Sequence, residues 1–240
     1  HGILNGIDYD EWHPGRDPFI AAKFSQDDLA GKSACKADLQ RTFGLAERPG
    51  VPLLAVISRL APQKGMDLVA EALGAMLALD TQFVLLGTGD AALHKAFETA
   101  KTRHRSRIGL KLGFDVALSH KIEAGADMFL MPSRYEPCGL NQMYSLAYGT
   151  VPVVRATGGL DDTIQPFDPT TGEGTGFKFA GETSQALLET VRAAVALYRR
   201  PDQWRHLIQN GMACDFSWDR SAREYEALYQ EIVARRTGRA

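Results

Sequence analysis

Three charged residues with the chemistry to bind phosphate or sugar groups each follow a short apolar run of the sequence. Arg59 and Lys64 follow the first run and would bring fixed positive charge. Glu136 follows the fourth run, two residues after Arg134. A carboxylate would repel a phosphate, but it can accept hydrogen bonds from the hydroxyl groups of a sugar or a ribose. Cations beside such an acid suit a sugar that carries phosphate.

Small residues and one aromatic residue follow the other apolar runs. A Thr-Gly-Gly sequence before a helical segment offers free backbone N–H groups and the positive end of a helix dipole, which suit a phosphate. Glycines also let a backbone approach a ligand closely, and Phe114 could stack on a flat base. The small residues are Gly87, Gly89, Thr157, Gly158 and Gly159. Together with the charged residues they predict a site for a nucleoside diphosphate that carries a sugar.

The elements that would position these residues alternate between strand and helix. Continuous apolar runs predict strands buried on both faces at residues 53–58, 82–87, 107–113, 128–132, 151–156 and 176–179. Apolar residues at helical spacing predict helices between them. The alternation predicts an α/β fold with a parallel sheet and helices on both faces. Ligands of such sheets bind outside the carboxyl ends of the strands, so the candidate residues would share one edge.

The two ends of the sequence differ from this alternating part. Residues 1–50 are rich in turn residues and predict an irregular arm with a short helix near residues 35–43. After residue 182 the pattern is helical to the end, and Pro201 can start one of these helices. The sequence begins within the arm and without Met, which indicates a piece of something longer.

Each candidate residue could also have a purely structural role, without binding a ligand. Arg59 and Lys64 could be solvated surface charges, and Glu136 could cap the helix that follows it. The Thr-Gly-Gly sequence could be a plain turn, and Phe114 could be a core residue. Five such features at the same edge of one sheet are harder to explain as accidents, so their shared position favours a site.

Composition narrows the class of protein. The chain is 45% hydrophobic and 23% charged with a net charge of -2, which is ordinary for a globular protein and indicates neither a nucleic-acid nor a membrane partner. Cys35, Cys138 and Cys214 are far apart and odd in number, so no disulfide framework or zinc spacing is visible and a reducing cytosolic compartment fits. The six histidines show no metal spacing either.

Four stretches of the sequence resemble a known family. The resemblance to bacterial glycogen synthase and plant starch synthase is carried by GILNGIDYDEWHP, ISRLAPQKG, SRYEPCGLNQMYSLAYGTVPVVRATGGLDDTI and DFSWDRSAREYEALY. It covers almost the whole chain, and the block at residues 133–164 is long and specific.

The resemblance implies a retaining glucosyltransferase that moves glucose from ADP-glucose to the non-reducing end of an α-1,4-glucan. It implies the C-terminal, donor-binding half of a GT-B glycosyltransferase, with a Rossmann-like parallel sheet. Residues 1–15 would be the hinge segment, residues 16–220 the nucleotide-sugar-binding domain, and residues 221–240 a C-terminal helix that packs back on the missing N-terminal domain. That missing domain would make most contacts with the glucan acceptor.

The resemblance also implies roles for individual residues. Arg59 and Lys64 would neutralise the leaving diphosphate, and Glu136 would bind hydroxyl groups of the donor glucose. Tyr144 stands where the wider superfamily often has a second Glu, which leaves the ribose contact open. The glucose pocket would be lined by Cys138, Gly139 and Leu140. The distal phosphate would be held by Thr157, Gly158 and Gly159, and the adenosine bounded by Gly87, Gly89 and Phe114.

Cofactor, compartment and rival functions follow from the same resemblance. No cofactor or metal is expected, because Arg59 and Lys64 carry the charge that a magnesium ion would bring. The compartment would be the bacterial cytoplasm, or the plastid stroma for a plant protein. The alternatives are another GT-B enzyme that uses a UDP-sugar, and a nucleotide-sugar-binding module without catalysis. The residues alone do not separate ADP-glucose from UDP-glucose.

Overall fold

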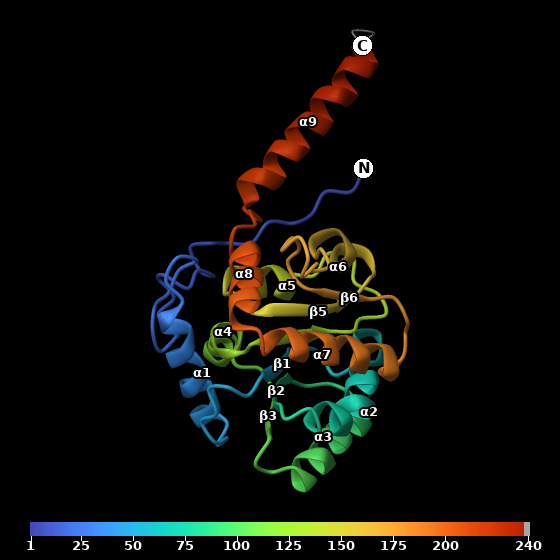
Figure 1. The fold of residues 1–240 in the computed structure, drawn as a ribbon. Coiled ribbons are helices and arrows are strands. Elements are labelled where there is room, and N and C mark those ends of the chain that lie inside the picture. The colour runs from blue at the N-terminus through green and yellow to red at the C-terminus, as the bar shows by residue number, and fades with distance from the viewer. Residues whose placement is uncertain (238–240) are drawn as a thin grey trace.

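A computed structural model describes residues 1–237 as a single parallel sheet covered by helices (Figure 1). The strand order is β3-β2-β1-β4-β5-β6, and every neighbouring pair is parallel. The strands are β1 Leu53–Ile57, β2 Gln82–Gly87, β3 Ile108–Leu112, β4 Met128–Met131, β5 Val151–Arg155 and β6 Phe177–Phe179. The expected α/β fold with a parallel sheet is confirmed, and each predicted strand is present.

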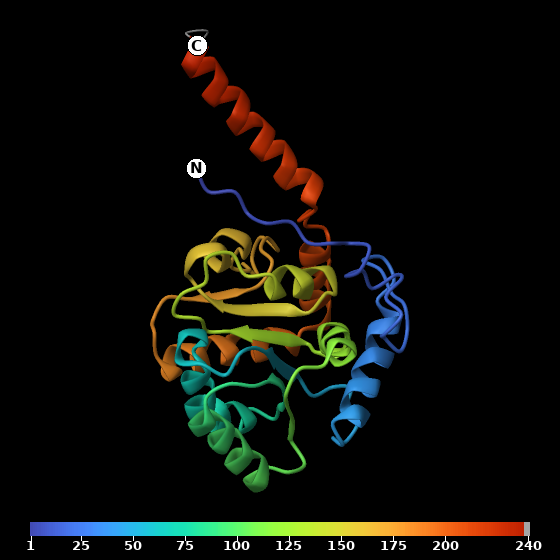
Figure 2. The ribbon, with the colours of Figure 1, turned by 180° about the vertical axis from the view of Figure 1, so that it is seen from behind.

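Helices cover both faces of this sheet (Figures 1 and 2). They are α1 Ala30–Thr42, the 3-10 turn η1 Pro62–Lys64, α2 Met66–Leu77, α3 Ala91–Arg103, α4 Val116–Gly125, α5 Asn141–Ala147, α6 Gly158–Thr163, α7 Ser184–Tyr198, α8 Pro201–Met212 and α9 Trp218–Thr237. Alternate residues of β1 point to opposite faces: Leu54 and Val56 pack in a core with α2, α3 and α7, whereas Leu53 and Ala55 pack in a second core with α1 and α4. Continuous apolarity in the strands is therefore explained by burial on both sides.

Local sequence sets where several helices begin. The carboxylates of Asp90 and Asp115 accept backbone N–H bonds at the starts of α3 and α4, and Thr183 does the same for α7. Pro201 occupies the first turn of α8, as expected. Gly65, with φ +67°, separates η1 from α2, so Lys64 ends a 3-10 turn and α2 begins only at Met66.

The N-terminal arm is anchored on α4 and α5. The Trp12 ring stacks between the rings of His120 and Tyr144, at centroid distances of 3.9 and 4.0 Å. The buried Asp17 carboxylate accepts a hydrogen bond from the Tyr148 hydroxyl, and its Oδ2 lies 2.7 Å from His120 Nδ1. Although burial raises the pKa of a carboxyl, these two hydrogen bonds hold the pKa of Asp17 below its usual value. The arm is thus irregular but firmly attached.

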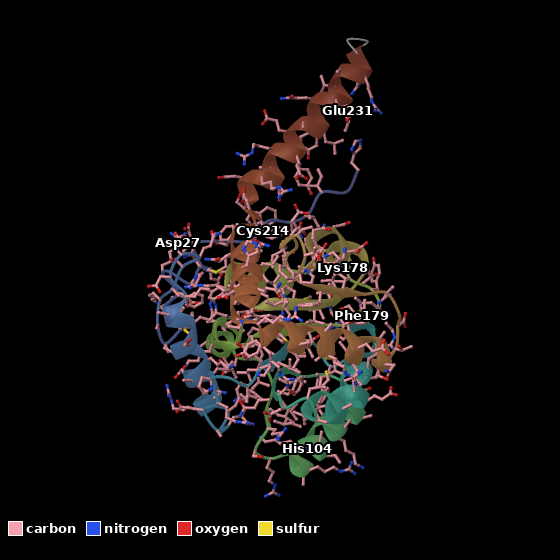
Figure 3. The ribbon with its side chains drawn as sticks, in the orientation of Figure 1. Asp27, His104, Lys178, Phe179, Cys214 and Glu231 are labelled. Carbon is pink, nitrogen blue, oxygen red and sulfur yellow. The ribbon has the colours of Figure 1, made fainter. Side chains whose placement is uncertain are left out.

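The last helix, α9, extends away from the body beside the start of the arm (Figures 1 and 2). Ile7 pairs with Ser217 just before α9, and the Ser221 hydroxyl donates to the Leu4 carbonyl. Beyond this base the helix stands free of the packed side chains that fill the body, as the position of Glu231 shows in Figure 3. Among residues 1–237, no helix has the length and apolarity needed to cross a membrane. Residues 238–240 of the predicted C-terminal segment lie outside the described residues.

Candidate functional site

Lys64 and Glu136 form an ion pair at the carboxyl edge of the sheet. Lys64 Nζ lies 2.6 Å from Glu136 Oε2, and the Ser133 hydroxyl donates to the same oxygen at 3.1 Å. Lys64 ends η1 after β1, and Glu136 lies in the loop between β4 and α5. The side chains of Glu136 and Lys64 are 8% and 23% exposed, so water shields this pair less than an open surface pair.

A hollow of about 190 Å³ surrounds this pair. It lies where β1 and β4 end side by side, at the point where the strand order reverses, and such a switch point is the usual ligand crevice of open α/β sheets. Five predicted residues line it: Arg59, Lys64, Glu136, Gly139 and Leu140. The other lining residues are Ile57, Ser58, Met66, Leu130, Met131, Ser133 and Asn141.

The Thr-Gly-Gly segment lies directly against the backbone of the Glu136 loop. A Cβ added at Gly158, where φ is +48°, would come within 2.2 Å of the Glu136 carbonyl oxygen, and one at Gly159 within 2.1 Å of the Cys138 carbonyl oxygen. The Gly159 N–H donates to the Glu136 carbonyl at 3.0 Å. That N–H is therefore already bonded, and the two glycines let β5–α6 approach the loop. Thr157 precedes α6 without a side-chain cap bond.

Gly87 and Gly89 lie in the same way against the loop that carries Arg59. A Cβ at Gly87 would meet the Ser58 carbonyl oxygen at 1.9 Å, and one at Gly89 the Leu60 carbonyl oxygen at 2.3 Å. Arg59 itself is exposed, and its Nη2 donates to Gln63 Oε1 at 3.3 Å. These glycines border the hollow through the Arg59 loop without lining it.

Phe114, Cys138 and Tyr144 have three different surroundings. Phe114 is 86% exposed in the turn between β3 and α4, so it is not a core residue. Cys138 was expected to line the glucose pocket but does not line the hollow, and its carbonyl oxygen lies against Gly159. Tyr144 stacks on Trp12 of the arm and is not part of the hollow's lining.

A family model for "Glycosyl transferases group 1" matches residues 41–211, which is more than half of the chain. The chain belongs to this family of glycosyl transferases. The matched segment contains both partners of the Lys64–Glu136 pair and every strand of the sheet.

Within this family, similar sequences and a similar solved structure support a resemblance to glycogen and starch synthases. Glycogen synthases from Anaeromyxobacter sp. and from Geobacter metallireducens are 58% and 54% identical over 98% and 99% of this chain. The catalytic domain of starch synthase IV from Arabidopsis thaliana, bound to ADP and acarbose, superimposes with a TM-score of 0.90 and 40% identity over 97% of the chain. These matches confirm the resemblance to glycogen and starch synthases and the GT-B type of glycosyltransferase fold.

The extent of the matches limits what they show. The chain spans about half of these relatives, 49% and 48% of the two glycogen synthases and 49% of the starch synthase chain. A sucrose-phosphate synthase from Thermosynechococcus elongatus matches with a TM-score of 0.67 but 21% identity, and it supports the fold alone.

Sequence reasoning missed two polar residues of this candidate site. Ser133 follows β4 directly and bonds Glu136, a position that the block at residues 133–164 contains but that spacing alone does not distinguish. Asn141 Nδ2 donates to the Ile57 carbonyl at 3.1 Å and ties the start of α5 to the end of β1. An Asn at a helix start has an ordinary capping interpretation, so its residue type did not single it out.

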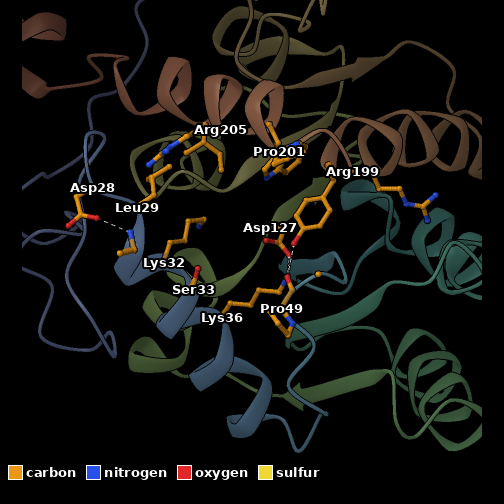
Figure 4. Close-up of a pocket in the computed structure, with 15 residues that line it drawn as sticks. Asp28, Leu29, Lys32, Ser33, Lys36, Pro49, Asp127, Arg199, Pro201 and Arg205 are labelled. Atoms are coloured by element: carbon orange, nitrogen blue, oxygen red, sulfur yellow. Dashed lines mark hydrogen bonds and ion pairs between the residues drawn. The ribbon is translucent and has the colours of Figure 1, made fainter.

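A larger hollow, of about 610 Å³, lies at the opposite, amino edge of the sheet between α1 and the α7–α8 turn (Figure 4). Its buried cations are already paired. Lys36 Nζ lies 2.6 Å from Asp127 Oδ2 and donates to the Tyr198 hydroxyl. Lys32 donates to two backbone carbonyls and to the Thr150 hydroxyl, and burial lowers its pKa to about 8. These contacts hold the glycosyl transferase domain together and leave the smaller hollow as the candidate site.

Proposed function

We propose that this chain is the donor-binding half of a glycogen or starch synthase and that the Lys64–Glu136 hollow binds the glucose end of ADP-glucose. The observation that carries this proposal is the ion pair itself, a cation and an acid held 2.6 Å apart at the strand-order switch point. The glycogen synthase relatives support the activity, and the ADP bound to the starch synthase IV catalytic domain supports the donor nucleotide.

The residues of the hollow would act as charge and hydroxyl partners in glucose transfer. The bond from glucose C1 to the diphosphate oxygen breaks, and a bond from C1 to an acceptor hydroxyl oxygen forms on the same face. The leaving phosphate takes the hydroxyl proton. Arg59 and Lys64 would stabilise the negative charge that develops on this leaving group. Glu136 would accept hydrogen bonds from glucose hydroxyl groups and so fix the ring.

The residues around the hollow extend the proposal to the nucleotide. The exposed Phe114 ring is available for stacking on adenine, with Gly87 and Gly89 at the neighbouring edge. The second phosphate would lie near Thr157 and Gly158, while the Gly159 N–H keeps its bond to Glu136. Cys138, Gly139 and Leu140 would bound the glucose. Because Arg59 and Lys64 supply the charge, we expect donor binding to persist in a metal chelator.

The second half of the longer relatives would supply the glucan acceptor site. Half of a cleft can hold the donor without aligning an acceptor hydroxyl, and alignment is a large part of catalysis. This chain is therefore expected to bind donor and to make no glucan alone. The bacterial relatives favour the bacterial cytoplasm over a plastid stroma as its place of action.

Calorimetry on this chain tests the proposal. ADP-glucose and ADP should bind more tightly than UDP-glucose or NAD, with and without chelator. Lys64→Met should weaken ADP-glucose binding by about tenfold or more, whereas Lys95→Met, on the exposed face of α3, should not change it. Tighter binding of NAD than of ADP would contradict a nucleotide-sugar site.

A further inference from the structure

Arg134, two residues before Glu136, has its guanidinium group engaged on two sides. Nη1 and Nη2 each donate to one oxygen of the Asp67 carboxylate at 2.7 Å, which is the bidentate geometry of a strong charge-assisted pair. Nε donates to Glu182 Oε1 at 2.6 Å, and Nη1 also donates to the Pro62 carbonyl. The Asp67 and Glu182 carboxylates raise the pKa of Arg134, and Arg134 lowers that of Asp67.

These bonds join the two segments that carry the ion pair. Pro62 begins η1, the turn that ends at Lys64, and Asp67 lies in the first turn of α2. Arg134 therefore contacts the chain both before and after Lys64. Its own backbone N–H adds a bond to the Gln63 carbonyl at 2.9 Å. The turn of Lys64 and the loop of Glu136 are thus bound to each other by one residue.

Backbone packing reinforces this junction. A Cβ on Gly65 would come within 2.1 Å of the Pro132 carbonyl oxygen, so the Lys64 turn lies directly on the loop that follows β4. On the other side, Arg155 Nε donates to the Ser133 carbonyl at 2.8 Å, and its Nη2 donates to the Arg134 carbonyl. The loop is held on both sides, and the side chain of Arg134 is the part that reaches across to α2.

Two roles can be distinguished for a cation at this place. A phosphate-binding arginine keeps N–H groups and charge available for the ligand. Arg134 instead has two carboxylates within hydrogen-bond distance, so its charge is already matched. We propose that Arg134 is a positioning residue that fixes the placement of Lys64 relative to Glu136, and thereby the shape of the donor site. This inference rests on the proposed function of the hollow.

The substitutions that test this role separate geometry from charge. Arg134→Lys keeps the charge but loses the bidentate fork, because an ammonium group offers no planar pair of donors. Arg134→Gln loses both. Arg192→Gln, on the exposed face of α7, removes one positive charge at a distance and serves as the matched control. The milder Lys variant also keeps the test valid if the Gln variant folds poorly.

The first measurement is ADP-glucose affinity by calorimetry on this chain. Arg134→Lys and Arg134→Gln should each weaken binding by about tenfold, within the range of coupling between contacting residues, and Arg192→Gln should not. In a Lys64→Met background, Arg134→Lys should change affinity by less than about twofold, because the residue it positions is gone. Equal losses in both backgrounds, or loss in the Gln variant but not in the Lys variant, would overturn the positioning role.

A second measurement needs no ligand. The coupling between Lys64→Met and Glu136→Gln is measured by urea unfolding, first with Arg134 in place and then in the background of the Arg134→Lys substitution. The coupling should fall by at least about half when the fork is lost, and an unchanged coupling would overturn the proposal. If the coupling falls but no ADP-glucose binds to the unsubstituted chain, the proposed donor has failed and the positioning role stands.

Discussion

Lys64 and Glu136 are 72 residues apart in the sequence and 2.6 Å apart in the structure. The contact crosses from the end of β1 to the end of β4, two strands that are neighbours in the sheet but not in the chain. Each side chain is the main charged partner of the other, and Ser133 is the further partner of Glu136. A donor bound as proposed would exchange this ion pair for its own phosphate and hydroxyl contacts.

This exchange predicts that a Lys64 variant loses both stability and turnover, and that a Glu136 variant loses less stability. Lys64→Met leaves the Glu136 carboxylate buried with one neutral hydrogen bond, so the free energy of unfolding should fall by about 1–3 kcal/mol. Glu136→Gln should cost less, because the amide can keep its hydrogen bonds. In the complete enzyme, Lys64→Met should lower kcat by about a hundredfold through lost stabilisation of the leaving group. Urea unfolding and steady-state kinetics measure the two effects, and unchanged kcat would remove Lys64 from the mechanism.

The glycine at position 158 should be intolerant of a side chain. Gly158→Ala would place a Cβ 2.2 Å from the Glu136 carbonyl oxygen at φ +48°, so the free energy of unfolding should fall by about 2 kcal/mol or more, with weaker donor binding. Gly74→Ala is the matched control, because nothing lies within 4 Å of its added Cβ on the exposed face of α2. That change should raise the free energy of unfolding by about 0.5–1 kcal/mol. Equal effects of the two substitutions in urea unfolding would show that close packing is not the reason for Gly158.

The strands and the shared edge of the candidate residues could be predicted because the central strands β1, β2, β4 and β5 are buried on both faces. That burial gives continuous apolar runs, and parallel topology then brings the residues after each run to one edge. Arg59, Lys64 and Glu136 needed no further information. The same logic could not show that the Gly159 N–H is bonded to the Glu136 carbonyl, because backbone pairing between loops leaves no mark on residue type.

Buried lysines explain the main error in the helices. The sequence pattern predicts the first helix near residues 35–43, but α1 runs over Ala30–Thr42. Lys32 and Lys36 lie on its buried side, where carbonyl groups, Thr150 and Asp127 satisfy their ammonium groups. Residues of a usually exposed type on the packed face hid the amphipathic pattern. The stacking of Tyr144 on Trp12 could not be predicted either, because Trp12 belongs to an arm whose sequence shows no periodicity.

A buried carboxyl group should make stability depend on pH. Glu123 is fully buried, and burial raises its pKa to about 8 although the Ser145 hydroxyl donates to it. In the unfolded chain a Glu ionises near pH ~4.3. Between about pH 4.3 and 8 the native state therefore holds one more proton than the unfolded state, and the free energy of unfolding falls as pH rises, by at most about 1.4 kcal/mol per pH unit.

Glu123→Gln isolates this contribution. The amide is neutral at every pH, so its free energy of unfolding should fall less between about pH 5 and pH 7.5 than that of the unsubstituted chain. Glu98→Gln, at an exposed position of α3, should keep the original slope. Urea unfolding at several pH values measures all three proteins. Parallel pH profiles for the Glu123→Gln variant and the unsubstituted chain would show that Glu123 does not cause the dependence.

The exposed apolar strip of α9 predicts where a second half of the protein docks. Tyr225, Tyr229 and Ile232 are 40%, 61% and 52% exposed, and their spacing places them on one side of the helix. Burial against a partner domain would remove this apolar surface from water, which favours docking. Tyr229→Ser should therefore lower both the melting temperature and kcat of the complete enzyme, while changing the stability of this chain by less than about 0.5 kcal/mol.

Ala227→Ser is the control for the strip, because two residues turn a helix by about 200° and place position 227 on the other side from Tyr229. It should leave the melting temperature and kcat of the complete enzyme unchanged. Calorimetric melting of both proteins and steady-state kinetics of the complete enzyme give the comparison. If Tyr229→Ser destabilises this chain as much as the complete enzyme, the effect comes from the helix itself and α9 does not dock through this strip. If it lowers stability in the complete enzyme alone, the strip is the contact that joins the donor-binding half to its partner domain.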